Sequence, residues 1–268
     1  RDLMTGEQGR WIRKRRNSRL RLLCCVIGLA PIGTTLLADE ALVAVAANFR
    51  ETLEKLEPEF EAASGHELTI AAGSTGKLFS QIELGAPFDV LLAADRERPE
   101  LLERKGDAVG GSRFTYAIGR LTLWSPEHGR VAADGSETLR AGAFRRLAIA
   151  NPELAPYGEA AVQALGALGL DDAVSRKIVR GENVGQAHAL VATGNAELGL
   201  VALSHVLSPR NGKPGSRWNV PQELHEPIRQ DAVLLSRAAD NAAARSFLQF
   251  LKSDAARSII ERSGYRVP

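Results

Sequence analysis

Apolar runs of strand length alternate with helix-like patterns along the chain from residue 41 onward. Largely apolar runs at 41–47, 68–72 and 88–94 have the length and composition of buried parallel strands. Apolar residues at helical spacing follow each run, as in residues 53–60 after the first. Three strand–helix units in succession predict an α/β fold with a mostly parallel sheet and right-handed crossovers.

The second half of the chain repeats this pattern and predicts a second domain. The apolar run 114–124 is longer than a usual strand, which predicts that it passes from the first domain into the second. A strand predicted at 231–235 then returns to the first domain. The predicted boundaries are a signal peptide at 1–38, lobe 1 at 39–118 and 230–268, and lobe 2 at 119–229. The other predicted elements are strands at 146–150 and 198–203, helices at 139–144, 161–168, 184–192, 242–251 and 254–261, and polar surface loops at 125–136 and 208–221.

Four predicted strand-to-helix junctions lie at Asn48, Ser74-Thr75, Tyr157 and Val184, two in each lobe. The first turn of a helix leaves backbone N–H groups without intrahelical partners at the positive end of the helix dipole. Ligands of open α/β sheets lie beyond the carboxyl ends of the strands. Two lobes joined by two crossing segments therefore predict a hinged cleft in which an anion is held from both sides.

The junction at Ser74 and Thr75 is distinctive because these residues lie between Gly73 and Gly76. Small residues allow an anion to approach the N–H groups of a helix start closely. Ser and Thr are also the commonest helix N-caps, so this stretch alone leaves a capping role open. It is not a phosphate-binding P-loop, because its glycines are too close together and Leu78 replaces the magnesium-binding hydroxyl of that motif.

The first 38 residues differ in character from the rest of the chain. A basic run at 13–16 precedes an apolar segment at 22–38, a pattern typical of a secretory signal peptide and of an extracytoplasmic protein. An uncleaved membrane anchor is the alternative, although about 17 apolar residues are marginal for a membrane span. Residues 1–38 hold eight of the 34 basic and two of the 32 acidic residues. The remainder has 26 basic and 30 acidic residues, a net charge of −4, which does not favour nucleic-acid binding.

The cysteines and histidines of the chain indicate neither a metal site nor thiol chemistry. Cys24 and Cys25 both fall in the predicted signal peptide, so the mature protein is predicted to lack disulfides and thiolate metal sites. No two histidines have the i,i+4 spacing of a helical zinc motif. The histidines are His66, His128, His188, His205 and His225.

Several segments, in order along the chain, carry a family resemblance. They are Val45-Ala46-Ala47-Asn48-Phe49, Gly73-Ser74-Thr75-Gly76-Lys77, Gly85-Ala86-Pro87-Phe88-Asp89-Val90, Ala93-Ala94-Asp95, the run from Gly111 to Gly119, Asn151-Pro152 with Ala155-Pro156-Tyr157-Gly158, and Asn183-Val184-Gly185-Gln186-Ala187. Together they closely resemble the periplasmic molybdate-binding proteins of ABC transporters, from about residue 41 to the C-terminus.

The resemblance implies a two-lobed type II periplasmic-binding fold, with mixed sheets flanked by helices and a ligand cleft between the lobes. It implies a monomeric binding protein rather than an enzyme, with molybdate or tungstate as ligand and neither a cofactor nor a metal site. Neutral hydrogen-bond donors would hold the oxyanion. The expected partners are an ABC permease and its ATPase at the inner membrane, with this protein in the periplasm.

The family's anion contacts fall by position on Ala47, Asn48, Ser74, Thr75, Tyr157 and Val184. Many members have Ser or Thr where this chain has Ala47, so Asn48 is expected to contribute its side-chain amide as well as its N–H. Tyr157 and Val184 are expected to donate through their backbone N–H groups. A tyrosine contact of some members is absent here, where the sequence is Val201-Ala202-Leu203.

Two alternatives remain open from the sequence. A receptor for sulfate, thiosulfate or phosphate would use the same helix-start donors. A secreted hydrolase with Ser74 as nucleophile would need a positioned histidine and a carboxylate. The chain has no Gly-x-Ser-x-Gly motif, which disfavours the hydrolase.

Overall fold

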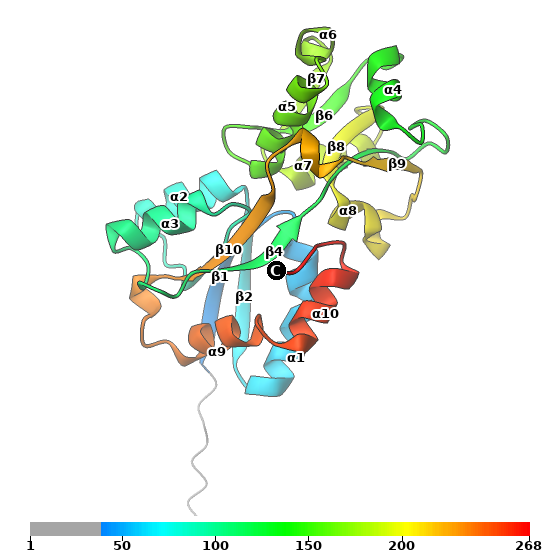
Figure 1. Cartoon of the computed structure of the whole chain (residues 1–268). Coiled ribbons are helices and arrows are strands. Elements are labelled where there is room, and N and C mark those ends of the chain that lie inside the picture. Colours follow the sequence, from blue (N-terminus) through cyan, green and yellow to red (C-terminus); the bar gives the residue numbers. More distant parts are fainter. Residues whose placement is uncertain (1–38) are drawn as a thin grey trace, which may run out of the picture. The chain divides into compact units, whose positions relative to one another are not determined.

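Two five-stranded mixed sheets form the framework of the computed structural model, which describes residues 39–268 (Figure 1). The predicted signal peptide at 1–38 lies outside the described residues. The first sheet has the strand order β2-β1-β3-β10-β4 and the second the order β7-β6-β8-β5-β9. The strands are β1 (Glu40–Ala46), β2 (Glu67–Gly73), β3 (Val90–Leu92), β4 (Phe114–Gly119), β5 (Leu121–Ser125), β6 (Leu147–Ala150), β7 (Ile178–Gly181), β8 (Leu198–Ala202), β9 (Ser216–Asn219) and β10 (Ile228–Leu234).

The first sheet is buried on both faces, which explains its largely apolar strands. β1 runs parallel to β2 and β3, whereas β10 runs antiparallel to β3 and β4. Val43 and Val45 pack in one core with residues of α1 (Arg50–Ser64), α9 (Ala242–Phe250) and α10 (Asp254–Arg262). Ala44, between them, packs in the opposite core with α2 (Thr75–Glu83) and α3 (Glu97–Lys105). Figure 1 shows these two groups of helices on opposite sides of the sheet.

The second sheet repeats the pattern of the first. β6 is parallel to β7 and β8, and β5 is antiparallel to β8 and β9. A single large core surrounds this sheet. The remaining helices are α4 (Gly135–Ala141), α5 (Pro156–Ala167), α6 (Asp171–Ser175), α7 (Val184–Ala192) and α8 (Leu203–Leu207), with 3-10 turns at Pro209–Asn211, Gln222–Leu224 and Ser236–Ala238.

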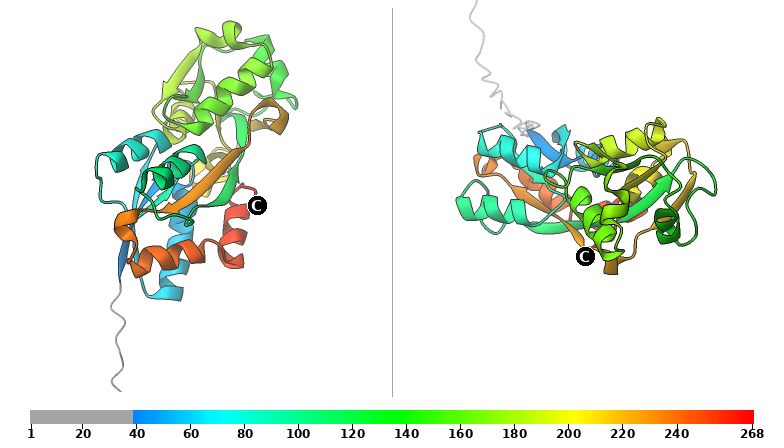
Figure 2. Two further views of the ribbon diagram at one scale, coloured as in Figure 1. Left: turned by 60° about the vertical axis from the view of Figure 1, so that its left-hand side comes forward. Right: turned by 90° about the horizontal axis from the view of Figure 1, so that it is seen from above.

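The chain passes between the sheets twice. The apolar run predicted as one long strand is divided into β4 and β5, which lie in different sheets with Arg120 between them. The chain returns to the first sheet between β9 and β10. The second predicted crossing strand is β10. Figure 2 shows β4 and β10, in green and orange, running alongside each other toward the second sheet. Their pairing is antiparallel, with a bulge between Gln230 and Asp231.

Three sequence predictions need correction. The segment 208–221, predicted as a surface loop, contains β9, because residues 216–219 pair with β5 and Thr122 Oγ1 donates to the Trp218 carbonyl. The helix predicted at 139–144 begins earlier, at Gly135, because the Asp134 carboxylate caps it by accepting from the Ser136 N–H. The short helix α8, directly after β8, was not predicted. No helix within residues 39–268 combines the length and apolar character that a membrane crossing needs.

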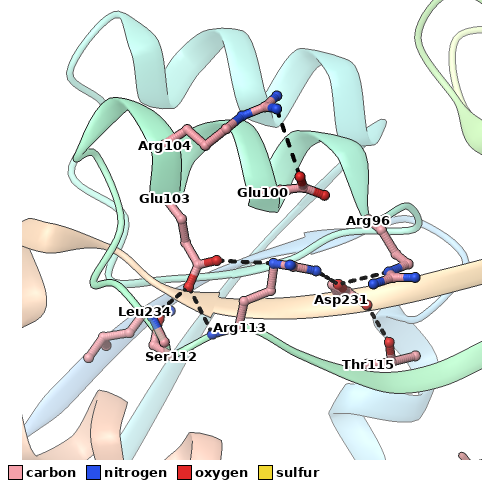
Figure 3. A network of polar contacts seen from close by, with 10 residues as sticks. Arg96, Glu100, Glu103, Arg104, Ser112, Arg113, Thr115, Asp231 and Leu234 are labelled. Carbon is pink, nitrogen blue, oxygen red and sulfur yellow. Dashed lines mark hydrogen bonds and ion pairs between the residues drawn. The ribbon is translucent and has the colours of Figure 1, made fainter.

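An ion-pair network joins β4, β10 and α3 on the first sheet (Figure 3). Asp231 is fully buried, and its carboxylate accepts from Arg113 at 2.7 Å and from the Thr115 hydroxyl at 2.6 Å. Arg96 lies 3.6 Å away, and Arg113 also bonds Glu103 at 3.1 Å. The buried carboxylate is therefore neutralised by fixed cations, the usual requirement for a charge away from water.

Candidate functional site

The turn after β1 places Ala47 and Asn48 at the carboxyl edge of the first sheet. The Ala47 N–H donates to the Gly73 carbonyl at 2.9 Å, which ties this turn to the end of β2. Asn48 is 2% exposed, and its N–H donates to no protein acceptor among the described residues. Helix α1 begins two residues later, so the turn is a strand-to-helix junction as predicted.

Ser74 and Thr75 lie between β2 and α2, and both are buried. Ser74 occupies the N-cap position but makes no capping hydrogen bond, and its hydroxyl has no partner. Thr75 Oγ1 accepts from the Ala94 N–H at 3.0 Å, so its own proton remains free to donate. The capping interpretation of Ser74 is therefore wrong, because its side chain makes no hydrogen bond to the helix. A buried hydroxyl without a partner is costly unless a ligand satisfies it.

Tyr157 and Val184 lie in the first turns of two helices that pack against the second sheet. Pro156 is the first residue of α5, where proline needs no N–H partner, and Tyr157 follows it. Asn183 caps α7 by accepting from the Gln186 N–H, and Val184 is the first helical residue. The N–H groups of Tyr157 and Val184 donate to no protein acceptor within residues 39–268.

All four junctions line one small cavity, as the sequence predicts. Its volume is about 10 Å³, close to the least that holds one water molecule. None of its lining residues carries a charge at neutral pH. They are Ala46, Ala47, Asn48, Gly73, Ser74, Thr75, Ala94, Ala155, Pro156, Tyr157, Asn183 and Val184.

Several direct contacts join the two sides of this cavity. The Gly76 N–H donates to the Leu154 carbonyl at 2.9 Å, and Lys77 pairs with Glu182 at 2.7 Å. On the other flank, His205 Nε2 lies 3.2 Å from the Ala47 carbonyl oxygen. These contacts connect segments that flank the first sheet with segments that flank the second, so the cavity is bounded on both sides.

Burial keeps Tyr157 and His205 neutral beside the cavity. Tyr157 is the one titratable lining residue among those described, and burial raises the pKa of its hydroxyl well above the ordinary value. Burial, and secondarily the nearby His188, lowers the pKa of His205 to about 4. The cavity therefore offers hydrogen-bond donors whose charge does not change near neutral pH.

The side chain of Asn48 does not have the role that the sequence predicts. Its amide nitrogen donates to Gln230 Oε1 at 2.9 Å and to the Tyr265 hydroxyl at 3.1 Å, so both of its hydrogens are occupied. Only the Asn48 N–H is left to donate into the cavity. Gln230 and Tyr265 could not be recognised from the sequence, because they are 182 and 217 residues from Asn48 and lie in no recognisable motif.

The described residues give no support to a hydrolase or a metal centre. The Ser74 hydroxyl has no hydrogen-bond partner, so no histidine is positioned as its base. Residues 39–268 contain no group of three or more His, Cys, Asp or Glu side chains placed to hold a metal ion. His188 instead stacks on Trp124, with ring centroids 4.8 Å apart, and Trp124 and Tyr116 are core residues.

Comparison with known proteins identifies the family. Residues 41–266 match the model of the bacterial extracellular solute-binding proteins. The chain belongs to this family. The molybdate-binding protein ModA of Azotobacter vinelandii is 48% identical over 246 residues, which cover 92% of this chain and 97% of that protein. ModA of Rhodobacter capsulatus is 44% identical over 243 residues, with 91% and 93% covered.

Solved structures agree with this assignment. The periplasmic molybdate-binding protein of Azotobacter vinelandii superposes with a TM-score of 0.82 at 43% identity, covering 85% of this chain and 99% of that one. The sulfate-binding protein SubI of Mycobacterium tuberculosis, with a TM-score of 0.72 at 14% identity, shares the fold. The predicted two-lobed type II periplasmic-binding fold is thus confirmed, with the first sheet in lobe 1 and the second in lobe 2.

Proposed function

We propose that this protein captures molybdate, and also tungstate, outside the cytoplasm and delivers it to an ABC importer. One observation carries the proposal: four strand-to-helix junctions, two from each lobe, enclose one cavity that offers uncharged donors. The names of its relatives in Azotobacter and Rhodobacter point to the same ligand. In this proposal Ala47, Asn48, Ser74, Thr75, Tyr157 and Val184 line the oxyanion site.

The donors suit a fully deprotonated tetrahedral dianion. Such an ion only accepts hydrogen bonds, and the free N–H groups and the Ser74 and Thr75 hydroxyls only need to donate. Hydrogen phosphate, in contrast, carries a proton that needs an acceptor, and no carboxylate lines the cavity. Charge-assisted hydrogen bonds contribute about 1.5–3 kcal/mol each, so several give roughly sub-micromolar affinity.

The size of the cavity requires the lobes to part slightly around the ligand. A four-oxygen anion is larger than the single water molecule that about 10 Å³ can hold. A hinge at the two crossing segments allows this adjustment while each junction stays rigid on its own sheet. Molybdate and tungstate are nearly the same size, so the donors are expected to bind them alike. The smaller sulfate should reach fewer of these donors at once and bind more weakly.

The remaining parts of the proposal follow from the family. The chain would act as a monomer without a cofactor, and not as an enzyme. Its location would be the periplasm, reached through the predicted signal peptide at 1–38. An ABC permease with its ATPase would receive the loaded protein, since a relative in Bacillus subtilis is named as an ABC transporter substrate-binding lipoprotein.

Calorimetry with a panel of oxyanions tests this function. Molybdate and tungstate should bind with similar affinity and raise the melting temperature of the protein by mass action on the folded state. Sulfate, thiosulfate and phosphate should bind at least about 100-fold more weakly, a difference of about 2.7 kcal/mol. Equal binding of sulfate or phosphate would reject molybdate selectivity, and hydrolysis of an ester that Ser74→Ala abolishes would indicate the hydrolase instead.

A further inference from the structure

The side-chain amide nitrogen and the backbone carbonyl of Asn48 both make hydrogen bonds behind the cavity. Its amide nitrogen donates to Gln230 and Tyr265, as described above. Its carbonyl accepts from the Tyr265 hydroxyl at 2.6 Å and from the Ser204 hydroxyl at 3.0 Å. The Asn48 N–H alone faces no protein acceptor among the described residues. The surrounding groups therefore fix the peptide whose N–H lines the cavity.

Gln230 occupies a fully buried position on β10, one of the two crossing strands. Its Oε1 accepts from Asn48 and from the Tyr116 hydroxyl at 3.1 Å. Its Nε2 and the hydroxyl of Tyr157 are both buried without a hydrogen-bond partner. A Cβ placed on Gly119 would lie 2.8 Å from Gln230 Nε2 and 2.3 Å from the Tyr157 hydroxyl. The Gln230 amide and the Tyr157 hydroxyl thus lie near each other beside Gly119. This residue is the last of β4, where the chain crosses between the lobes.

Tyr157 therefore contributes to two places, through its backbone N–H and through its side chain. Its backbone N–H lines the cavity, whereas its ring reaches the crossing segment beside Gln230. The ring occupies the space that a side chain on residue 119 would need, which explains the glycine there. Movement of lobe 2 away from lobe 1 would withdraw the Tyr157 ring and the Ser204 hydroxyl from their lobe 1 neighbours together.

We infer that Gln230 and Tyr265 are positioning residues for oxyanion binding, which hold the Asn48 peptide with its N–H toward the cavity when the lobes close. This inference rests on the proposed function. Neither residue lines the cavity, so neither touches the ligand. Both residues belong to lobe 1. The Tyr265 hydroxyl oxygen lies 3.0 Å from that of Ser204, and the Gln230 amide lies beside the Tyr157 hydroxyl, both in lobe 2. The network is complete only with the lobes together, so its loss should speed ligand release more than it slows capture.

Conservative substitutions separate positioning from general stability. Tyr265→Phe removes the hydroxyl that serves Asn48, and Gln230→Met removes the amide at similar volume. Thr122→Val is the matched control, because Thr122 is a fully buried lobe 2 residue whose hydroxyl donates to the Trp218 carbonyl at 3.0 Å, outside the cavity lining. Calorimetry would measure the Kd for molybdate, stopped-flow fluorescence the release rate, and thermal unfolding the Tm without ligand.

The two positioning variants should raise the Kd about tenfold or more, mainly through faster release, as expected for the loss of a hydrogen bond to a buried group. Thr122→Val should lower the Tm and leave the Kd within about twofold, since its hydrogen bond stabilises the fold alone. Unchanged Kd values for Tyr265→Phe and Gln230→Met, beside a lowered Tm, would overturn the inference, because the network would then be merely structural.

A milder variant keeps the test decisive if the buried substitutions prevent folding. Ser204→Ala removes a partly exposed hydroxyl that shares the Asn48 carbonyl with Tyr265. It should raise the Kd about threefold to fivefold, and its effect should be non-additive with that of Tyr265→Phe. An unchanged Kd for Ser204→Ala would contradict the inference. If the unmodified protein binds no oxyanion at all, the proposed function fails and this inference fails with it.

Discussion

The protein handles buried negative charge in two different ways. Asp231 is a buried resident carboxylate, and two arginines and a hydroxyl surround it (Figure 3). The interlobe cavity is proposed to hold a transient dianion, yet no charged side chain lines it. Its donors are backbone N–H groups at helix starts and two hydroxyls. The two regions are connected through β10, because Asp231 follows Gln230, which lies behind the cavity.

The difference reflects how long each charge stays in place. An arginine in the cavity would lose its partner whenever the ligand left, and a buried unpaired cation is costly. Peptide N–H groups carry only partial charges and tolerate the absence of an acceptor far better. Neutral donors therefore allow tight binding and release in turn, whereas ion pairing suits a carboxylate that never leaves.

A carboxylate in the cavity should abolish anion binding. Thr75→Asp places a negative charge about 4 Å from the dianion, which costs at least about 4 kcal/mol even at an effective dielectric of 20. Molybdate affinity should fall about 1,000-fold or more in calorimetry. Some loss of stability is expected as well, because Thr75 is buried and an unpaired buried carboxylate is costly. Thr75→Asn, of similar size without charge, is the control, and equal affinities of the two variants would show that Thr75 lies outside the site.

Removal of the charge at Asp231 should reduce stability without reducing affinity. Asp231→Asn leaves Arg113 and Arg96 without their buried counterion, which should lower the free energy of unfolding by about 2–4 kcal/mol in urea titrations. Arg113 retains Glu103 and is partly exposed, which limits the loss. Adding Arg113→Gln should recover part of this loss. A large loss of molybdate affinity in Asp231→Asn would contradict the separation of the two regions.

One backbone donor can be deleted cleanly at Val184. This residue is the first of α7, a position that tolerates proline, and Asn183 before it has extended backbone angles. Val184→Pro should therefore remove the N–H without disrupting the helix. Molybdate binding should weaken about 10-fold to 100-fold. Val184→Ala controls for lost packing, and Ala242→Pro, at the exposed first residue of α9, controls for proline itself. If all three variants bind alike, the Val184 N–H is not a ligand donor.

The positions of the four junctions could be predicted from the sequence because each depends on local signals. An apolar strand followed by a small or capping residue and a helical pattern fixes where N–H groups are left free. The topology of α/β sheets then brings such ends together, which explains why Asn48, Ser74-Thr75, Tyr157 and Val184 share one cavity.

The residues behind the cavity could not be predicted in this way. Gln230 and Tyr265 contact Asn48 only in the folded protein. Nothing in their local sequence indicates a role near the site. The expectation that the Asn48 amide faces the ligand failed for this reason. Likewise, β9 was missed because its four residues belong to a polar segment and depend on pairing with the edge of β5.

Affinity should be nearly independent of pH near neutrality, the smallest effect expected here. The pKa of Tyr157 is raised well above its ordinary value, and that of His205 is lowered to about 4, so neither group changes charge between pH 6.5 and 8.5. The Kd for molybdate should vary less than about twofold over this range. Below pH 6.5 the unfolded chain protonates His205 while the folded protein does not, so the free energy of unfolding should fall toward pH 4 by up to a few kcal/mol. His205→Gln should reduce this slope in urea titrations, whereas a steep change of Kd around pH 7 would indicate a titrating cation in the cavity.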